Sequence, residues 1–318
     1  MAILGWLPDR VTAQQNPPCC PGECCPTSLV VPFAAGGPTD VVGRAVAKAL
    51  GPQLKVTVVV ENKSGAGGIV GADAVARGSK KGEQALLATN AVLMTSLLST
   101  KSPFRFNADL RPIAMLGSAP FVLLVPADSP VRSPKELVQA LKSASDTKKY
   151  ASPGSGTASH FAAELYLQSI SASASHVPFR GLQAALDAFA FGQIAFGFFD
   201  APTALDAIRQ GKVRALGVSS SGRSKLLPDT PPLREQGQPD FEAVAWYGIF
   251  TATGVPDASA QRWQTAVTGA LEGTDLRNQL ELLGIVPQLL QPEPFRQFLA
   301  LQTSKWADVA KKSSMRLE

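Results

Sequence analysis

The chain has little of several things that would point to particular functions. Its 318 residues include only two histidines and four cysteines, and 17% of them are charged. No apolar run reaches the roughly 18 residues that a membrane span needs. The formal net charge of +5 is spread along the chain rather than gathered in one stretch. These features argue against a membrane span and a nucleic-acid-binding stripe, while a mild preference for small anions is reasonable. We predict no cofactor, no metal site and no nucleic-acid partner.

The cysteines are confined to one short segment. All four, Cys19, Cys20, Cys24 and Cys25, lie around a Pro-Gly pair. Four thiols could bind Zn²⁺ or become oxidised, but adjacent cysteines match the usual C-x₂₋₄-C spacing poorly. We expect residues 1–27 to be a disordered leader and the rest of the chain to fold without a disulfide.

The N-terminal residues do not resemble an export signal. Met1 to Leu7 is too short for the apolar core of a signal peptide, and Pro8, Asp9 and Arg10 interrupt it. Two interpretations stay open: the true start lies upstream, or this copy has lost its signal.

The remaining sequence has the pattern of an α/β protein. Short apolar runs alternate with segments of helical periodicity, which predicts parallel βαβ units. The expected strands are 56–60, 85–88, 121–125, 194–199 and 215–218. The expected helices are 69–76, 134–143, 158–170, 182–191, 203–210, 258–272, 274–283 and 294–311. The length allows one large or two modest domains.

The most informative motif is Leu29-Val-Val-Pro-Phe-Ala-Ala-Gly-Gly-Pro-Thr-Asp40. It predicts a buried strand, a tight glycine turn and a helix with Pro38 in its first position. The free N–H groups and positive dipole end of such a helix start form a natural anion site. A carboxylate beside a bound anion would repel it, so we expect Asp40 to bond to the loop. A contact between Asp40 and a ligand ammonium group is the alternative.

A second glycine loop repeats this pattern. Ser152-Pro-Gly-Ser-Gly-Thr157 follows a short strand and precedes a helix that Ser155 or Thr157 can cap. Two such helix starts could hold a carboxylate between them. Nucleotide binding is disfavoured, because the chain lacks both the P-loop signature and the third glycine of a dinucleotide fingerprint.

Together these motifs resemble a known family. The others, in chain order, are Val60-Glu-Asn-Lys-Ser-Gly-Ala-Gly-Gly68, His176-Val-Pro-Phe-Arg-Gly181, Gly211-Lys-Val-Arg-Ala-Leu-Gly217, Arg223 to Pro228, and Trp246-Tyr-Gly248. The chain from about Ser28 onward resembles the Bug-type solute-binding receptors, the periplasmic component of tripartite tricarboxylate transporters. One departure is Phe179, which stands where this family usually has tyrosine.

The resemblance implies a fold and a function. It implies the two-lobed type II periplasmic binding protein fold, with lobe 1 at 28–120 plus 222–318, lobe 2 at 121–221, and a ligand cleft between them. It implies a non-enzymatic, periplasmic receptor that captures a small carboxylate and delivers it to membrane permease subunits. The predicted ligand-binding residues are Phe33, Gly36, Gly37, Thr39, Asp40, Asn90, Ser152, Gly154, Ser155, Gly156, Thr157, Phe179 and Asp200.

Alternatives remain for the function and for individual residues. A sensing module that reports to a signalling partner would need the same closing cleft. A hydrolase could be imagined from Ser152, His160 and Asp200, but no nucleophile-elbow motif supports it. We expect His160 to pack or bond at a helix start and His176 to brace the loop before Pro178. Arg180 either approaches a second ligand carboxylate or stays solvated.

Overall fold

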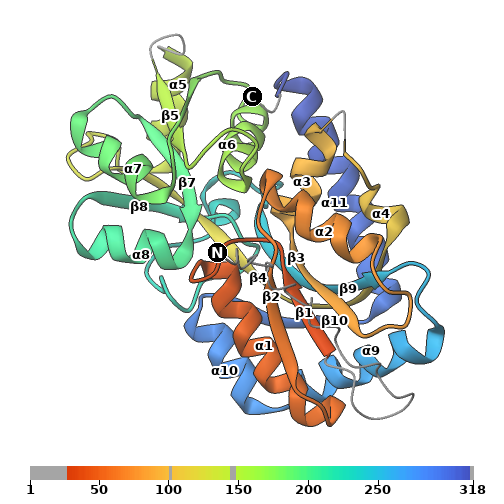
Figure 1. Cartoon of the computed structure of the whole chain (residues 1–318). Coiled ribbons are helices and arrows are strands. Elements are labelled where there is room, and N and C mark those ends of the chain that lie inside the picture. The colour runs from red at the N-terminus through yellow and green to blue at the C-terminus, as the bar shows by residue number, and fades with distance from the viewer. Residues whose placement is uncertain (1–26, 100–101, 144–147, 316–318) are drawn as a thin grey trace, which may run out of the picture.

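A computed structural model describes residues 27–99, 102–143 and 148–315 (Figure 1). The predicted leader therefore lies outside the described residues, apart from Thr27, which begins the first strand. The strands are β1 (Thr27–Val31), β2 (Val58–Asn62), β3 (Gln84–Thr89), β4 (Leu110–Pro126), β5 (Lys149–Ser152), β6 (Ser175–Pro178), β7 (Phe196–Asp200), β8 (Val213–Val218), β9 (Val244–Ala252) and β10 (Val286–Leu290). The α-helices are α1 (Pro38–Leu54), α2 (Ile69–Ala76), α3 (Asn90–Leu98), α4 (Phe106–Asp109), α5 (Pro134–Ser143), α6 (Ala158–Ser169), α7 (Leu182–Asp187), α8 (Ala201–Arg209), α9 (Asp257–Glu272), α10 (Thr274–Leu282) and α11 (Pro292–Lys312). Short 3₁₀ turns cover Ala66–Gly68, Ala188–Phe191 and Leu233–Gln236.

The long strand β4 joins two halves of the sheet. The main path runs β2-β1-β3-β9-β4-β7-β5-β6, and β8 and β10 also pair with β4. Up to Pro120 β4 pairs with β9 and β10, and from Phe121 onward it pairs with β7 and β8. We call the strands on the β9 side the first sheet half and those on the β7 side the second. Figure 1 shows the second half, in green, beside the first.

The prediction of parallel βαβ units throughout is wrong for the centre of the sheet. Parallel pairing joins β1 to β2 and β3, and β5 to β6 and β7. Every pair that involves β4 or β9 is antiparallel. The apolar runs of these strands carry no information about direction, because both kinds of strand are buried on two faces here.

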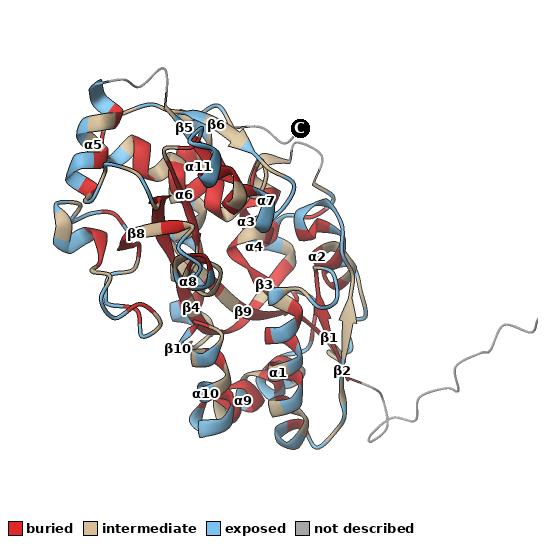
Figure 2. Ribbon diagram, turned by 90° about the vertical axis from the view of Figure 1, so that its left-hand side faces the viewer, coloured by how far each residue is buried: buried red, intermediate tan, exposed pale blue. Residues whose placement is uncertain are grey.

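Helices cover both faces of the sheet. In β1, Leu29 and Val31 point into a core shared with α1, α9 and α10, while Val30 points into the opposite core with α2 and α11. This alternation follows from the two-residue period of a strand. A third core packs α7 and α8 against the second sheet half. Figure 2 shows the same layering, with buried residues along the sheet and exposed ones on the outer faces of α1, α9 and α10.

The chain crosses between the halves a second time beside β4. Ser219 exchanges backbone and side-chain hydrogen bonds with Phe121, and its carbonyl accepts from Ala243 N–H at 3.0 Å. The C-terminal helix α11 also bridges the halves, because Trp306 packs edge-on against Phe161 of α6. Among the described residues, the two halves are thus joined by two adjacent crossings and by the packing of α11 and α3 against α6.

Candidate functional site

The first glycine loop, residues 32–37, ends β1 and starts α1 as predicted. Pro38 is in the first turn of the helix, and Gly37 is its N-cap with an extended backbone, φ −78° and ψ 169°. The left-handed conformation belongs to Gly36 instead, with φ +79°. Gly37 therefore has no positive φ, and the backbone there is unstrained. A Cβ at Gly37 would lie 3.3 Å from the carbonyl oxygen of Ala34, so the turn is compact.

Asp40 braces this loop from inside. Its side chain is buried, and it accepts hydrogen bonds from Gly36 N–H at 2.8 Å, Asn62 Nδ2 at 2.9 Å and Arg44 Nε at 2.9 Å. The bonds from Arg44, Gly36 and Asn62 lower the pKa of Asp40 to about 2. The structure supports the bracing role of Asp40 over a contact with a ligand ammonium group, because both carboxylate oxygens are already used.

The start of α1 leaves donors available. Within the described residues, the N–H groups of Thr39 and Asp40 have no acceptor, while Val41 N–H bonds to Gly37 O. Phe33 is half-buried, and its carbonyl accepts from Asn62 Nδ2 at 3.1 Å. Asn62 therefore ties the loop to β2, a role that sequence reasoning missed. The available signal was that Asn62 belongs to the Val60–Gly68 motif, whereas its contact with the loop depends on the pairing of β2 with β1.

Asn90 follows β3 directly, as predicted. It begins α3, and its side chain is buried. Its side-chain amide donates to the carbonyl of Val244 at 3.3 Å, which fixes the end of β3 to β9.

The second glycine loop, residues 152–157, is braced in the same manner but by other residues. Thr157 caps α6, as predicted, by accepting from His160 N–H, and its hydroxyl donates to Gly154 O at 2.8 Å. Gly154 and Gly156 have φ of +153° and +72°, a conformation that only glycine adopts without strain. The buried hydroxyl of Ser152 is 2.7 Å from His176 Nε2.

Both histidines serve this loop. His160 Nδ1 accepts from Gly156 N–H at 3.1 Å, which confirms the expected bond at a helix start. The two imidazoles stack with ring centroids 3.7 Å apart. Burial and the nearby His176 lower the pKa of His160 to about 3, and burial lowers that of His176 to about 4. Both rings are therefore neutral at pH 7.

The imagined arrangement of Ser152, His160 and Asp200 does not form. Ser152 bonds to the other histidine, and Asp200 caps α8 by accepting from Thr203 N–H at 3.0 Å and its hydroxyl at 2.7 Å. The nearby charge of Asp200 adds to burial in raising the pKa of Tyr247. Tyr247 lies on β9 of the first sheet half and Asp200 at the end of β7 in the second, and only Asp200 was predicted.

All predicted ligand-binding residues except Asn90 and Asp200 form two groups. Phe33, Gly36, Gly37, Thr39 and Asp40 surround the start of α1, while the second loop is joined by Phe179, whose N–H bonds to Ser152 O at 3.0 Å. Figure 1 places the start of α1 at the boundary with the half that carries α6, α7 and α8.

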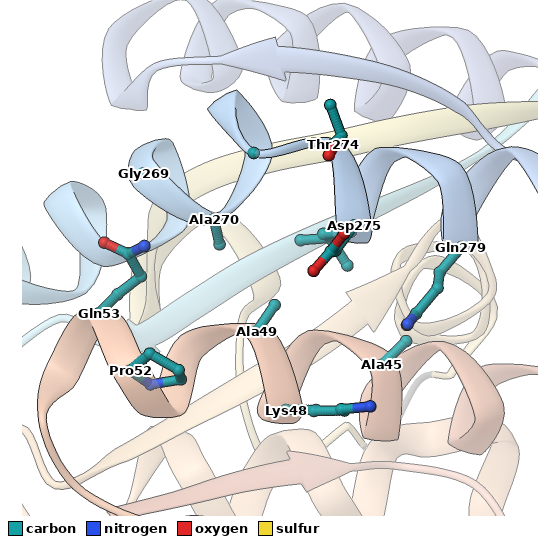
Figure 3. Close-up of a pocket in the computed structure, with 12 residues that line it drawn as sticks. Ala45, Lys48, Ala49, Pro52, Gln53, Gly269, Ala270, Thr274, Asp275 and Gln279 are labelled. Carbon is teal, nitrogen blue, oxygen red and sulfur yellow. The ribbon is translucent and has the colours of Figure 1, made fainter.

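A recess of about 410 Å³ lies elsewhere, between α1 and the α9–α10 corner (Figure 3). Its walls include Ala45, Lys48, Gly269 and Asp275, and none of the predicted ligand residues contributes to it. In the described ranges, no three His, Cys, Asp or Glu side chains are grouped closely enough to hold a metal ion. None of the helices there combines the length and apolar composition that a membrane span requires.

The fold and the paired loops define a class, the two-lobed solute-binding receptors of the periplasmic binding type. The family model for the tripartite tricarboxylate transporter family receptor matches residues 42–315. The chain belongs to this receptor family, which is a family of solute-binding proteins and not a class of enzymes.

Individual relatives agree over nearly the whole chain. BugT of Bordetella pertussis is 29% identical over 295 residues, which is 92% of this chain and 90% of that protein. A protein encoded in the tcbD-tcbE intergenic region of a Pseudomonas strain is 30% identical over 282 residues, 88% of this chain and 84% of the relative.

Solved structures show the same likeness. MatC from Rhodopseudomonas palustris with bound malate superposes with a TM-score of 0.75 at 32% identity, covering 89% of this chain and 98% of MatC. The periplasmic binding protein BugD superposes with a TM-score of 0.76 at 29% identity, covering 92% of this chain and 99% of BugD.

Proposed function

We propose that this protein is the extracytoplasmic receptor that captures a small carboxylate for a tripartite tricarboxylate-type transporter. The observation that carries the proposal is the pair of glycine loops, each at the start of a helix and each braced by its own side chains. The likeness to MatC with bound malate supports the ligand class. In this proposal the partner is a set of membrane permease subunits, and the site of action is the periplasm.

The two lobes of the proposal meet at β4. Lobe 1 comprises residues 28–120 and 222–318, and lobe 2 comprises residues 121–221. The change of β4's partners between Pro120 and Phe121 supports this division. The second crossing at Ser219 lies beside the first. Two adjacent crossings permit hinge closure on a ligand held between the lobes.

Backbone donors at both helix starts would hold the ligand carboxylates. On α1 these are the N–H groups of Thr39 and Asp40, and on α6 they include Ser155 N–H. Charge-assisted hydrogen bonds contribute about 1.5–3 kcal/mol each, so three or four support micromolar binding near −8 kcal/mol. Phe33, Gly36, Gly37, Asn90, Phe179 and Asp200 complete the proposed surroundings.

Calorimetry with a panel of mono-, di- and tricarboxylates and acidic amino acids tests the ligand class. The panel includes malate. We expect at least one of its dicarboxylates to bind with a Kd in the micromolar range. Folded protein that binds no member of the panel would remove the carboxylate assignment.

A matched pair of glycine variants tests the site. Gly37 and Gly273 are both helix N-caps with extended backbones, and a Cβ at either would lie near a carbonyl oxygen, at 3.3 and 3.5 Å. Gly37→Val should weaken carboxylate binding at least tenfold, because the side chain crowds the donors of α1. Gly273→Val should cost similar stability and leave the affinity unchanged. If Gly37→Val binds the carboxylate as tightly as the wild-type protein and Gly273→Val do, the first loop is not part of the site.

A further inference from the structure

We propose that His160 and His176 are positioning residues that hold the second glycine loop in the conformation that accepts a ligand carboxylate. The inference rests on the proposed function and adds two residues outside the predicted ligand-binding set: His160 was expected to pack or bond at a helix start, and His176 to brace the loop before Pro178.

The two histidines form hydrogen bonds with opposite ends of the loop. His176, on β6, lies in register with Tyr150 of the neighbouring strand β5, so its Nε2 reaches the hydroxyl of Ser152 at 2.7 Å. His160, in the first turn of α6, accepts from Gly156 N–H at 3.1 Å. The two imidazole rings stack on each other, with centroids 3.7 Å apart and an interplanar angle of 18°. The stack therefore connects the hydrogen bonds at the two ends of the loop.

The stack is anchored in the interior of the second sheet half. His176 also stacks on Tyr150 at 4.9 Å, and Tyr150 stacks on Phe196 at 5.5 Å. The hydroxyl of Tyr150 donates to Glu164 on α6. The four rings therefore connect β5, β6, β7 and α6, and the loop is tied to all four elements.

The hydrogen bonds within the loop determine which of its N–H donors stay without an acceptor. Ser152 Oγ also accepts from Gly154 N–H at 3.2 Å, and Thr157 N–H bonds to Gly154 O. Among the described N–H groups from Gly154 to Thr157, this leaves only that of Ser155 without an acceptor in the protein. A loop fixed in advance does not lose conformational freedom when a carboxylate arrives, so the affinity is higher.

The chemistry requires neutral rings. Because Gly156 N–H donates to His160 Nδ1, that nitrogen carries no proton and the other ring nitrogen does. A proton on Nδ1 would set two donors against each other and place a charge on the stack. The neutral state at pH 7 follows from the burial of both rings.

Two pairs of variants separate the hydrogen bond of the ring nitrogen from the ring itself. His160→Asn keeps an acceptor near the position of Nδ1, while His160→Phe keeps the ring and loses the acceptor. His176→Gln keeps a polar group near Nε2 that can donate to or accept from the Ser152 hydroxyl, while His176→Phe keeps the ring and loses that hydrogen bond. The measurements are the Kd for malate, the Tm, and the amide hydrogen exchange of Gly156 and Ser155 in the ligand-free protein.

We expect the two phenylalanine variants to bind malate about tenfold more weakly than the wild-type protein. The amide hydrogen of Gly156 should exchange about tenfold faster in these variants, while the amide hydrogens of β4 should exchange at the wild-type rate. The asparagine and glutamine variants should stay within about threefold of wild type on both measurements. Phenylalanine variants with wild-type Kd and wild-type loop exchange would overturn the inference. So would a loss of affinity that follows the Tm equally in all four variants.

The outcome also separates this inference from the proposed function. If the wild-type protein binds no carboxylate of the panel, the proposed function fails, and the ligand-positioning role fails with it. The hydrogen exchange of the loop then still shows whether the histidines hold it.

Discussion

The stacked histidines predict an acid-dependent loss of stability. Their pKa values fall from an ordinary 6.5 to about 3 for His160 and about 4 for His176, because burial disfavours the charged rings. The unfolded chain takes up protons near pH 6.5 that the folded protein does not bind. The free energy of unfolding therefore rises with pH between about 4 and 6.5 and is level above that range.

The magnitude follows from proton linkage. A histidine with an unfolded pKa of 6.5 that stays neutral in the folded protein lowers the free energy of unfolding by about 2 kcal/mol between pH 7 and pH 5. We assign about 2 kcal/mol to buried His160 and about 1 kcal/mol to half-buried His176, whose charge water partly screens. The expected loss is about 3 kcal/mol in total. The low pKa of Asp40, about 2, places its own contribution below this window.

Urea denaturation at pH 7, 6 and 5 measures this loss directly. His160→Asn should remove about 2 kcal/mol of the pH dependence, whatever its effect on stability at pH 7. The chain has no other histidine, so no third imidazole can contribute. A wild-type free energy that changes by less than 1 kcal/mol between pH 7 and pH 5 would refute the buried neutral pair. If the free energy of unfolding of His160→Asn depends on pH as strongly as that of the wild-type protein, the assignment to His160 is refuted.

Three further substitutions test other parts of the structure by chemical denaturation at pH 7. Gly43→Ala should lower the free energy of unfolding by about 1–3 kcal/mol, because a Cβ there would lie 2.5 Å from Val31 Cγ2. An unchanged free energy would show that α1 can move away from β1 to make room for the methyl group. Thr157→Ala should cost about 1 kcal/mol by removing the cap of α6, and a loss under 0.3 kcal/mol would contradict the cap. Arg111→Ala should change the free energy of unfolding by less than about 1 kcal/mol, because the side chain of its partner Asp257 is 93% exposed. A loss of about 3 kcal/mol would mean that this ion pair is stronger than exposed pairs usually are.

Local pattern predicted much of the fold. The helical periodicity of 134–143 and 274–283 corresponds to α5 and α10, since each is an amphipathic helix on the surface. The pattern did not predict β9 as a strand or α3 as a helix. The strand β9 is buried and pairs only with distant segments, so nothing near it in the chain reveals its partners. The helix α3 is apolar on most sides and lacks a polar face.

The candidate site was partly predictable for a similar reason. Gly-Gly-Pro and Pro-Gly-Ser-Gly-Thr report on their own backbone, so the two loops and the Thr157 cap follow from short sequences. The braces of these loops come from elsewhere. Asn62 reaches Asp40 from 22 positions away, and His176 reaches Ser152 from 24. Contacts of that kind depend on strand register, which the sequence of one chain does not reveal.

The shared strand β4 has a consequence for how receptors of this kind diversify. β4 is paired with β7, β8, β9 and β10, and a Cβ at Gly117 would lie 2.4 Å from the carbonyl oxygen of Val286. A change in β4 therefore disturbs both halves of the molecule together. The glycine loops lie outside that strand, and each is held by side chains of its own half. Substitutions in the loops can therefore change the groups that face a ligand without disturbing the strand that joins the two halves.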